Sequence, residues 1–382
     1  MKKKHPTKKI AIVIPTYSLV GGAEAFAVNL TEEMAKESNY EFHVIANKIQ
    51  RESKGIIFHH VPIIKIPRFL TTPSFAYFTQ RIIKKHQFDI VHSHERIFDA
   101  DIFTTHGIPH RYWIENIRKK RMFSLHDRTI SFVEKRIMNS PNCHYYAPVS
   151  NLTKKIMLSE YCLEDKSIQV ICPGVDRKFF ATQNKNETRR LVRNHFGFNQ
   201  NDVVFLFVSM NFEIKGLDSI IQAISQLKNT SVFSKIKLLI VGKGNQRKYE
   251  KMATELGVCE NLVFTGILPQ EKLIQTYFAS DAFIMLSFFD TFGMVVLEAM
   301  ASGLPAIISG NVGAKDVIVE GENGFVIDFP LTTASIVEKL NILCEQEKLK
   351  EMGESAIKTA HNHSWGKTSK QVLDIYQEIL KK

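Results

Sequence analysis

The sequence predicts an α/β protein built from two doubly wound, Rossmann-like domains. Its 382 residues are too many for one ordinary core and suit two domains of fewer than about 200 residues each. In the second half, short apolar stretches alternate with helix-forming stretches, and such alternation gives a parallel sheet. We place the domains at residues 1–175 and 176–364, since the polar stretch 183–190 just beyond the boundary is typical of a linker.

The first half opens with an apolar strand at 9–15 and a loop that contains Gly21 and Gly22, before a helix expected at about 23–37. A glycine pair between a first strand and a first helix lets the backbone approach a phosphate. Neither this loop nor residues 242–247 match GxGxxG, which argues against a nicotinamide cofactor. Further strands are expected at 41–46, 56–66, 88–92 and 145–150, and a helix at 73–85.

The second half alternates most regularly. Strands are expected at 203–209, 236–241, 261–265, 282–286 and 306–309. Helices are expected to begin near Gly216, Gln246, Gln270 and Gly293. Because ligands of a doubly wound sheet lie beyond the carboxyl ends of its strands, we look for a site in the loops that follow these strands.

Positive charge is concentrated in the first half. Residues 1–170 carry 26 Lys and Arg against 16 Asp and Glu, whereas residues 171–382 carry 24 against 23. A basic domain favours an anionic partner such as a phosphorylated glycan, a membrane surface or nucleic acid, although scattered lysines can also serve solubility alone.

The cysteine and hydropathy patterns favour a cytoplasmic protein. The five cysteines show neither CxxC spacing nor the density of a disulfide framework, which indicates a reducing compartment. The basic N-terminus is followed by an apolar run only from Ile10 to Ile14, so we interpret this run as a strand and not as a signal peptide. No apolar run reaches the length of a membrane span.

Residues 287–310 carry the strongest functional pattern: a strand end, a glycine turn, a short helix and another strand. Ser287, Asp290 and Thr291 stand where we expect a helix cap, and 295–301 is expected to form the helix. A helix N-terminus at the carboxyl edge of a sheet collects unpaired N–H groups and can receive a diphosphate. An ordinary capped helix of an α/β core is the alternative interpretation.

Charged residues flank this expected anion site. Asp290 and Glu298 are eight residues apart, about two helical turns, which predicts that they share one side of the site. Carboxylates accept hydrogen bonds from hydroxyl groups, so the pair suits a sugar nucleotide. Lys215 precedes a glycine at the expected start of another helix, where its ammonium would neutralise a diphosphate.

The stretch DTFGMVVLEAMASGLP at 290–305 resembles the carboxylate, seven residues, glutamate signature of the retaining glycosyltransferases of family 4, particularly of their lipopolysaccharide core glucosyltransferase branch. The signature usually begins with Glu, whereas this chain has Asp290, which keeps the charge and shortens the reach. The resemblance implies the GT-B fold, in which two Rossmann-like domains face a cleft. It also implies that residues 365–382 form a terminal helix that completes the first domain.

The same resemblance assigns the sugar donor to the second domain. It implies that Glu298 binds the ribose hydroxyls, Asp290 the donor sugar and Lys215 the donor phosphates, with no metal or other cofactor. The arginine that accompanies this lysine in the family is absent, its candidate positions being Ser209 and Ile214. The implied donor-binding set is Gly21, Gly22, Lys215, Asp290, Phe292, Gly293, Met294, Val295 and Glu298.

Four histidines fall within nineteen residues, at His92, His94, His106 and His110. Their spacing matches no set zinc pattern, and the acidic triplet 99–101 precedes a strand in the first half, so we expect no metal site. By resemblance, a histidine of this loop contacts the donor sugar. We favour His106, which joins Lys215 and Asp290 as a catalytic residue, over His110, which lies nearer the histidine of the lipopolysaccharide branch. A histidine that is hydrogen-bonded within its loop is the alternative.

Residues 111–136 form the most basic stretch, and their cations are interleaved with apolar and aromatic side chains. This composition suits a surface that lies on anionic lipid headgroups or grips a phosphorylated acceptor. A solvated helix is the plain alternative, and nucleic-acid binding lacks an accompanying recognition motif. The residues assigned to the acceptor or membrane are His110, Arg118, Lys119, Lys120 and Arg121.

Taken with the resemblance, the sequence predicts a retaining, metal-independent hexosyltransferase. The expected donor is a nucleoside diphosphate sugar, with a UDP-sugar favoured, and the expected acceptor is an anionic cell-surface glycan or lipid-linked acceptor such as lipopolysaccharide core. We expect it in the cytoplasm, peripheral on the inner face of the membrane. The alternatives are a sugar-nucleotide epimerase, which would isomerise the donor alone, and a non-catalytic sugar-nucleotide- or membrane-binding protein.

Overall fold

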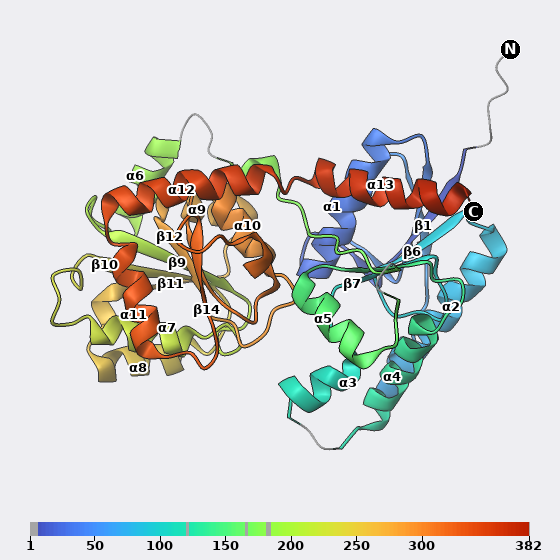
Figure 1. Cartoon of the computed structure of the whole chain (residues 1–382), viewed down its shortest axis with the longest axis horizontal. Helices are drawn as coiled ribbons and strands as arrows, with labels where there is room; N and C mark the ends of the chain where they lie inside the picture. The colour runs from blue at the N-terminus through green and yellow to red at the C-terminus, as the bar shows by residue number, and fades with distance from the viewer. Residues whose placement is uncertain (1–6, 120–121, 165–166, 181–184, 382) are drawn as a thin grey trace, which may run out of the picture. The chain divides into compact units, whose positions relative to one another are not determined.

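The computed structural model describes residues 7–119, 122–164, 167–180 and 185–381. Contacts divide the chain into two units, the first comprising Met1–Gly174 and Trp365–Lys382 and the second Val175–Ser364 (Figure 1). Each unit contains a six-stranded parallel sheet. The two Rossmann-like domains predicted from the alternation of strands and helices are therefore confirmed.

The sheet of the first unit has the strand order β5-β3-β1-β6-β7-β8. Its strands are β1 (Lys9–Val13), β3 (Glu41–Ala46), β5 (Ile56–His60), β6 (Ile90–Ser93), β7 (Ile102–Thr105) and β8 (Tyr145–Pro148). Residues 10–13 are fully buried, because a central strand of a parallel sheet is covered on both faces. The short strands β2 (Thr16–Tyr17) and β4 (Lys48–Ile49) pair separately.

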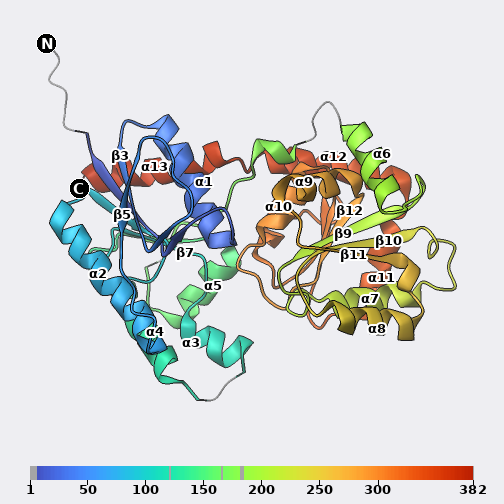
Figure 2. The same ribbon diagram turned by 180° about the vertical axis from the view of Figure 1, so that it is seen from behind.

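Helices cover both faces of this sheet. On one face α1 (Gly22–Glu37) lies beside α13 (Trp365–Lys381), as Figures 1 and 2 show. On the other face α2 (Thr71–His86) and α4 (Leu125–Met138) contact each other and share one apolar core with the strands. The remaining helical segments are η1 (Arg68–Leu70), α3 (His110–Tyr112), the π-helical η2 (Trp113–Ile117) and α5 (Asn151–Glu160).

The helix α13 brings the end of the chain back to the first unit. The ring of Trp365 packs edge-on against Phe26 of α1, with 5.3 Å between ring centroids. Farther along α13, the hydroxyl of Tyr376 lies 2.7 Å from Nδ1 of His92 on β6. Because all these side chains are buried, the last helix is part of the core of this unit.

The sheet of the second unit has the order β11-β10-β9-β12-β13-β14. Its strands are β9 (Val203–Ser209), β10 (Ile236–Gly242), β11 (Leu262–Gly266), β12 (Ala282–Met285), β13 (Ala306–Ser309) and β14 (Gly324–Ile327). The strands predicted at 203–209 and 306–309 are confirmed with the same bounds, and the other three are confirmed to within one residue.

The helices of this unit also lie on both faces of the sheet, with α7, α8 and α11 on one side and α9, α10 and α12 on the other (Figures 1 and 2). Their bounds are α6 (Lys185–His195), α7 (Leu217–Gln226), α8 (Gln246–Leu256), α9 (Gln270–Ala279), α10 (Met294–Ala301), α11 (Thr333–Ile342) and α12 (Gln346–His361). Three short 3₁₀ turns are η4 (Arg177–Phe179), η5 (Cys259–Asn261) and η6 (Gly313–Val317).

The strands predicted at 9–15 and 145–150 end two residues early, and the strand predicted at 56–66 is much shorter than expected. The strand predicted at 56–66 ends at His60, and the chain then runs irregularly to η1. Pro62 lacks the backbone N–H that a sheet ladder requires, which accounts for the early end. No helix of the described ranges is both long and apolar enough to cross a bilayer.

Gly216 is expected to resist substitution. Its φ is +72°, and a Cβ atom would lie 2.3 Å from the carbonyl oxygen of Leu286. Gly321 has a similar φ of +76° with open space at the Cβ position, so Gly321→Ala should cost only the left-handed backbone conformation, about 1 kcal/mol. Gly216→Ala should lower the free energy of unfolding by clearly more, measured by calorimetry. Equal losses in the two variants would contradict the close approach.

Candidate active site

Lys215 lies at the carboxyl edge of the second sheet, directly before α7. Gly216 is the N-cap of α7, and because it has no side chain its backbone passes close to Leu286 at the end of β12. The amide of Phe288 also donates a hydrogen bond of 2.8 Å to the carbonyl of Ile214. These backbone contacts bring Lys215 to the loop that precedes α10.

Lys215 and Asp290 form an ion pair in which Nζ donates to Oδ2. The two side chains are 19% and 21% exposed, so a ligand in solvent can reach the pair. The backbone of Asp290 is held in place, because its N–H donates to Asn311 and its carbonyl accepts from Gly313, both at 3.0 Å. The structure therefore places together two charged residues that the sequence assigned from separate motifs.

The N-terminus of α10 is not capped as expected. Gly293 is the N-cap, with φ of 87° and no hydrogen bond from a side chain, so the cap predicted from Ser287, Asp290 and Thr291 is wrong. The helix begins at Met294, one residue before the predicted start. In the first turn the N–H of Val296 donates to the carbonyl of Gly293 at 2.9 Å. The N–H groups of Met294 and Val295, which precede any intrahelical acceptor, are therefore the ones that can receive an anion.

Glu298 lies in the second turn of α10, half-buried, and accepts a 2.9 Å hydrogen bond from the hydroxyl of Tyr277 on α9. Burial raises the pKa of Glu298 to about 7, so its carboxyl group is partly protonated at neutral pH. Asp290 precedes the helix and pairs with Val312 in an isolated β-bridge, so the predicted separation of Asp290 and Glu298 by two helical turns is wrong.

The structure also shows what stands at the candidate positions of the absent arginine. Ser209 is buried at the end of β9, and Ile214 carries no charge. Lys243, which directly follows β10, donates its N–H to the carbonyl of Ser209 at 2.9 Å, and its side chain is exposed. The sequence analysis did not identify Lys243 as a second cation at the carboxyl edge. Its position directly after the glycine that follows a predicted strand could have indicated it.

The first unit has a cavity of about 220 Å³ at the carboxyl ends of β6 and β7. Its walls include Ala23 of α1, Glu134 of α4 and Tyr161 just after α5. Gly21 is the N-cap of α1, with φ of 102°, and Gly22 is its first residue. The predicted glycine pair therefore directly precedes Ala23 of the cavity wall.

His106 belongs to the wall of the cavity and ends a stack of three histidines. Its Nε2 lies 2.9 Å from Nδ1 of His94, and the rings of His94 and His92 are 4.4 Å apart between centroids. Phe26 packs edge-on against His106 at 4.8 Å. Burial lowers the pKa of His92 and His106 to about 3, so these rings are neutral at physiological pH.

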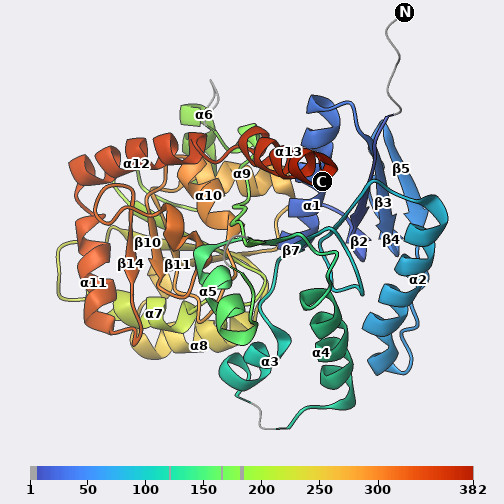
Figure 3. The ribbon, with the colours of Figure 1, turned by 45° about the vertical axis from the view of Figure 1, so that its right-hand side comes forward.

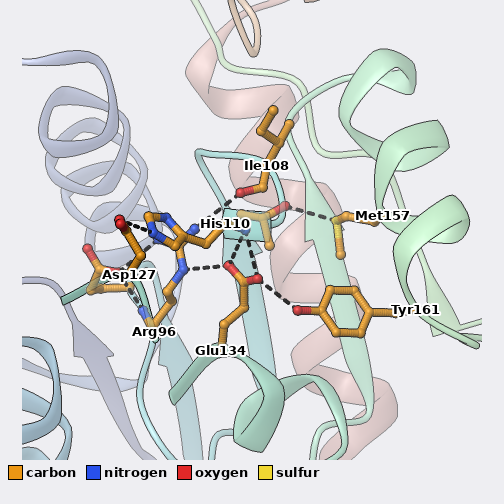
Figure 4. A network of polar contacts seen from close by, with 9 residues as sticks. Arg96, Ile108, His110, Asp127, Glu134, Met157 and Tyr161 are labelled. Atoms are coloured by element: carbon orange, nitrogen blue, oxygen red, sulfur yellow. Dashed lines mark hydrogen bonds and ion pairs between the residues drawn. The ribbon is translucent and has the colours of Figure 1, made fainter. Parts of the chain in front are cut away.

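Glu134 is the central acceptor of a polar network beside this cavity (Figure 4). It accepts hydrogen bonds from Nε of Arg96 at 2.6 Å, from the hydroxyl of Tyr161 at 2.7 Å and from the N–H of His110 at 2.9 Å. Arg96 also donates to the carbonyl of Ile108 at 3.2 Å. The network ties the loops after β6 and β7 to α4 and α5, and no local sequence motif pointed to it.

His110 is tied to the start of α4. Its Nε2 lies 3.1 Å from Oδ1 of Asp127, and its side chain is mostly buried. Burial alone would raise the pKa of Asp127, but hydrogen bonds from Ser124 and His110 lower it to about 2. Four other residues were assigned to the acceptor or membrane. Arg118 and Lys119 are exposed, and Lys120 and Arg121 lie outside the described residues.

The two patterns weighed as metal sites have structural partners. Asp101 accepts a 2.7 Å hydrogen bond from the N–H of Val91, and Asp99 accepts one of 2.7 Å from the side chain of Asn142. Within the described part of the chain, no group of three or more His, Cys, Asp or Glu side chains is arranged to hold a metal ion.

Two protein-family models match this chain. The model described as Glycosyltransferase Family 4 matches residues 20–179, and the model described as Glycosyl transferases group 1 matches residues 188–360. The first match lies almost entirely in the first structural unit and the second lies within the second unit.

Curated relatives carry glycosyltransferase names. The D-inositol 3-phosphate glycosyltransferase of Corynebacterium glutamicum (strain R) is 28% identical over 229 residues, which cover 59% of this chain and 54% of that protein. The chain thus spans about half the length of the first relatives it matches. The N-acetyl-alpha-D-glucosaminyl L-malate synthase of Bacillus anthracis is 23% identical over 394 residues, covering 98% of each chain.

Solved structures share the fold over nearly the whole chain. WaaG, a glycosyltransferase involved in lipopolysaccharide biosynthesis, has a TM-score of 0.80 at 20% identity and covers 96% of this chain and 99% of its own. Anabaena Alr3699/HepE, solved in complex with UDP-glucose, has a TM-score of 0.72 at 16% identity and covers 97% and 99%.

The fold and the two family matches define a glycosyltransferase with the GT-B fold, which confirms the predicted fold class. The chain is a GT-B glycosyltransferase of the family 4 type, in agreement with the resemblance of residues 290–305. The sequence signature and the structure therefore agree on the class of protein, and the donor and acceptor become the next question.

Stability should depend on pH through Glu298. Its pKa is raised in the folded state, so its stabilising contribution is complete below the unfolded value near 4.5 and is lost as pH rises through about 7. Glu298→Gln should therefore raise the Tm at pH 8.5 by about 5 °C and leave it nearly unchanged at pH 4.5. The exposed Glu271→Gln is the control and should show no such trend. A Tm difference that does not change with pH would refute the buried carboxyl.

The Glu134 network should matter for the stability of the first unit. Glu134→Ala removes the buried carboxylate of Arg96 and leaves its guanidinium only the longer 3.5 Å pair with Glu95, so the expected loss is about 3 kcal/mol. Glu115→Ala removes an exposed ion pair with Arg111 and should cost no more than about 0.5 kcal/mol. Both tryptophans of the chain belong to this unit, so urea unfolding followed by their fluorescence reports the difference. Similar midpoints for the two variants would contradict it.

Proposed function

We propose that this chain transfers a sugar from a nucleoside diphosphate sugar, most simply a UDP-sugar, to a cell-surface glycan or lipid-linked acceptor such as lipopolysaccharide core. The observation that carries this proposal is the juxtaposition of Lys215, Asp290 and the uncapped N-terminus of α10. A UDP-sugar donor is supported by the complex of HepE with UDP-glucose, and the acceptor class by the named role of WaaG.

The proposed donor site uses the edge residues of the second unit. Lys215 and the N–H groups of residues 292–295 would hold the diphosphate, while Glu298 would accept hydrogen bonds from the ribose hydroxyls. Asp290 would bind the donor sugar once the diphosphate attracts the ammonium of Lys215 away from it. We propose Lys243 as the second cation near the diphosphate, in the role of the arginine that this chain lacks.

The proposed chemistry retains the configuration of the transferred sugar. The bond between the anomeric carbon and the diphosphate oxygen breaks, and the charge that develops on that oxygen is stabilised by Lys215 and by backbone N–H groups. The acceptor hydroxyl attacks from the same face, forms the new carbon–oxygen bond and gives its proton to the departing diphosphate. No metal ion and no separate catalytic carboxylate pair are needed for this sequence.

We assign the acceptor and part of the donor recognition to the first unit. The cavity beside Glu134 presents Arg96, Tyr161 and neutral histidines, groups that bind sugar hydroxyls. His106 would contact the donor sugar as a neutral hydrogen-bonding group. The backbone at Gly21 and Gly22 would approach the diphosphate, and Arg118 and Lys119 would meet an anionic acceptor or the cytoplasmic membrane face.

Donor binding followed by turnover tests this proposal. Calorimetric titration with UDP, GDP, ADP and CMP sugars, with a chelator present, should give binding to one nucleotide class, and NMR of the product should show the retained anomeric configuration. Isomerised donor without acceptor would instead establish the epimerase. Donor binding without turnover over a panel of lipid-linked and glycan acceptors would establish a non-catalytic binding protein. This protein class is the second candidate because the arginine is absent and Lys215 is paired with Asp290.

Replacing Lys215 should selectively weaken donor binding. Lys215→Ala removes a charge-assisted contact to the diphosphate, so the Kd for the donor should rise by about 10- to 100-fold. Lys248→Ala is the matched control, because Lys248 also pairs with a carboxylate, Glu213, of the loop before α7. Titration calorimetry compares them. An equal effect of both substitutions, or none from Lys215→Ala, would place the diphosphate elsewhere.

A further inference from the structure

A second concave feature of the first unit lies outside the proposed acceptor cavity. It is a groove of about 820 Å³ on the surface formed by α2 and α4, which lie next to each other in Figure 3. Its walls come from both helices, from the residues after α4 and from the segment between β6 and β7. The charged and aromatic members of the wall are Tyr77, Arg81, Lys84, Phe98, Asp99, Phe132, Lys135 and Arg136.

The exposed side of α2 carries only positive charge. Arg81, Lys84 and Lys85 are exposed with Tyr77 at spacings of four, seven and eight residues, which places them along one helical stripe. No Asp or Glu occurs in residues 71–86. The stripe therefore has no acidic residue of its own helix to neutralise it.

The helix α4 separates its charges by face. Its two acidic residues, Asp127 and Glu134, are buried and bind His110 and Arg96 inside the unit. Its outward positions are apolar or cationic. They are Leu125, Arg128, Phe132, Lys135 and Arg136.

The cations of the groove are uncompensated. In the ranges that the structure covers, none of Arg81, Lys84, Lys135 and Arg136 forms an ion pair. The single carboxylate of the wall, Asp99, accepts hydrogen bonds from Ser140 and Asn142. Four positive charges and one negative charge therefore face one groove, which is a strong preference for an anionic partner.

Large apolar side chains surround this charge. Tyr77 and Phe132, which face the groove from opposite helices, are 52% and 57% exposed. The segment η1, which leads into α2, is held against the first turns of α4 by a 2.9 Å hydrogen bond from Thr129 to the carbonyl of Phe69. At this end of the helix pair the exposed apolar side chains are Ile66, Met122 and Leu125.

We propose that the α2–α4 face docks on an anionic phospholipid bilayer. Lipid phosphates would occupy the groove between the cations, while Tyr77 and Phe132 would enter the interfacial layer, as aromatic side chains do at membrane surfaces. A soluble polyanion would use the cations but would leave the apolar side chains in water, which is why the structure favours a bilayer. This inference rests on the peripheral attachment proposed above and assigns it to a face of two helices that the sequence-based assignment to 118–121 did not include.

Vesicle flotation tests the proposal on the full chain. The wild type should bind vesicles of phosphatidylcholine mixed with phosphatidylglycerol, bind phosphatidylcholine alone far more weakly, and be released by salt. The variant Arg81→Gln, Lys84→Gln, Lys135→Gln and Arg136→Gln should lose affinity about a hundredfold or more. A variant with Tyr77→Ser and Phe132→Ser, which keeps every cation, should lose about tenfold.

A matched control removes four exposed cations from the second unit, through Lys228→Gln, Arg247→Gln, Lys251→Gln and Lys272→Gln, with the same change in net charge. It should bind vesicles like the wild type. An equal loss in the control would show that net charge, not this face, drives binding and would overturn the proposal. So would unaltered binding by the groove variant, or full competition by inorganic phosphate at matched ionic strength.

Donor titration separates this proposal from the proposed function. The groove variants should bind nucleotide sugar with the affinity of the wild type, which also shows that they are folded. Loss of vesicle binding with intact donor binding supports the docking face. If the wild type binds donor but no anionic vesicle, the docking face is wrong and the transferase proposal stands. If it binds anionic vesicles but no donor of the panel, the transferase proposal is wrong and the docking face stands.

Discussion

The close backbone approach between Gly216 and Leu286 is the contact on which the candidate donor site depends. It joins the start of α7 to the end of β12, and only a residue without a side chain fits there. Lys215 is thereby held against Asp290, 75 residues later in the chain. The resulting ion pair stands beside the N-terminus of α10, where backbone N–H groups lack a side-chain cap. An anionic ligand that enters this edge meets a cation and oriented dipoles that are already in place.

Burial decides the charge state of several groups near the proposed ligands. The pKa of Glu298 rises to about 7 because burial removes its carboxyl from water, although the hydrogen bond from Tyr277 opposes this rise. The pKa of His106 falls to about 3 because its ring is packed between His94 and Phe26. In both cases the low-dielectric surroundings disfavour the charged form. The two units therefore present hydrogen-bonding groups of reduced charge, which suit the recognition of sugar hydroxyls.

The outer surface of the first unit carries charged groups, in contrast to the groups of reduced charge near the proposed ligands. On α4 the acidic side chains point inward, where Glu134 binds Arg96, and the basic side chains point outward. On α2 no acidic side chain is present at all. Part of the excess positive charge of the first half thus lies on one pair of neighbouring helices. The same helix α4 supplies the inner wall of the cavity through Glu134 and part of the outer groove through Phe132.

Sequence patterns alone predicted the fold class, most strand bounds of the second unit and the residue types of the candidate donor edge, because periodicity and glycine positions are local properties. These patterns could not predict that Gly293 caps α10, because the cap depends on a left-handed backbone angle. They also could not predict that Glu298 is partly protonated, because desolvation of its carboxyl depends on packing. The Glu134 network and the α2–α4 groove join residues that are far apart in the chain. Only the tertiary structure decided these features, because contacts between distant segments leave no local pattern.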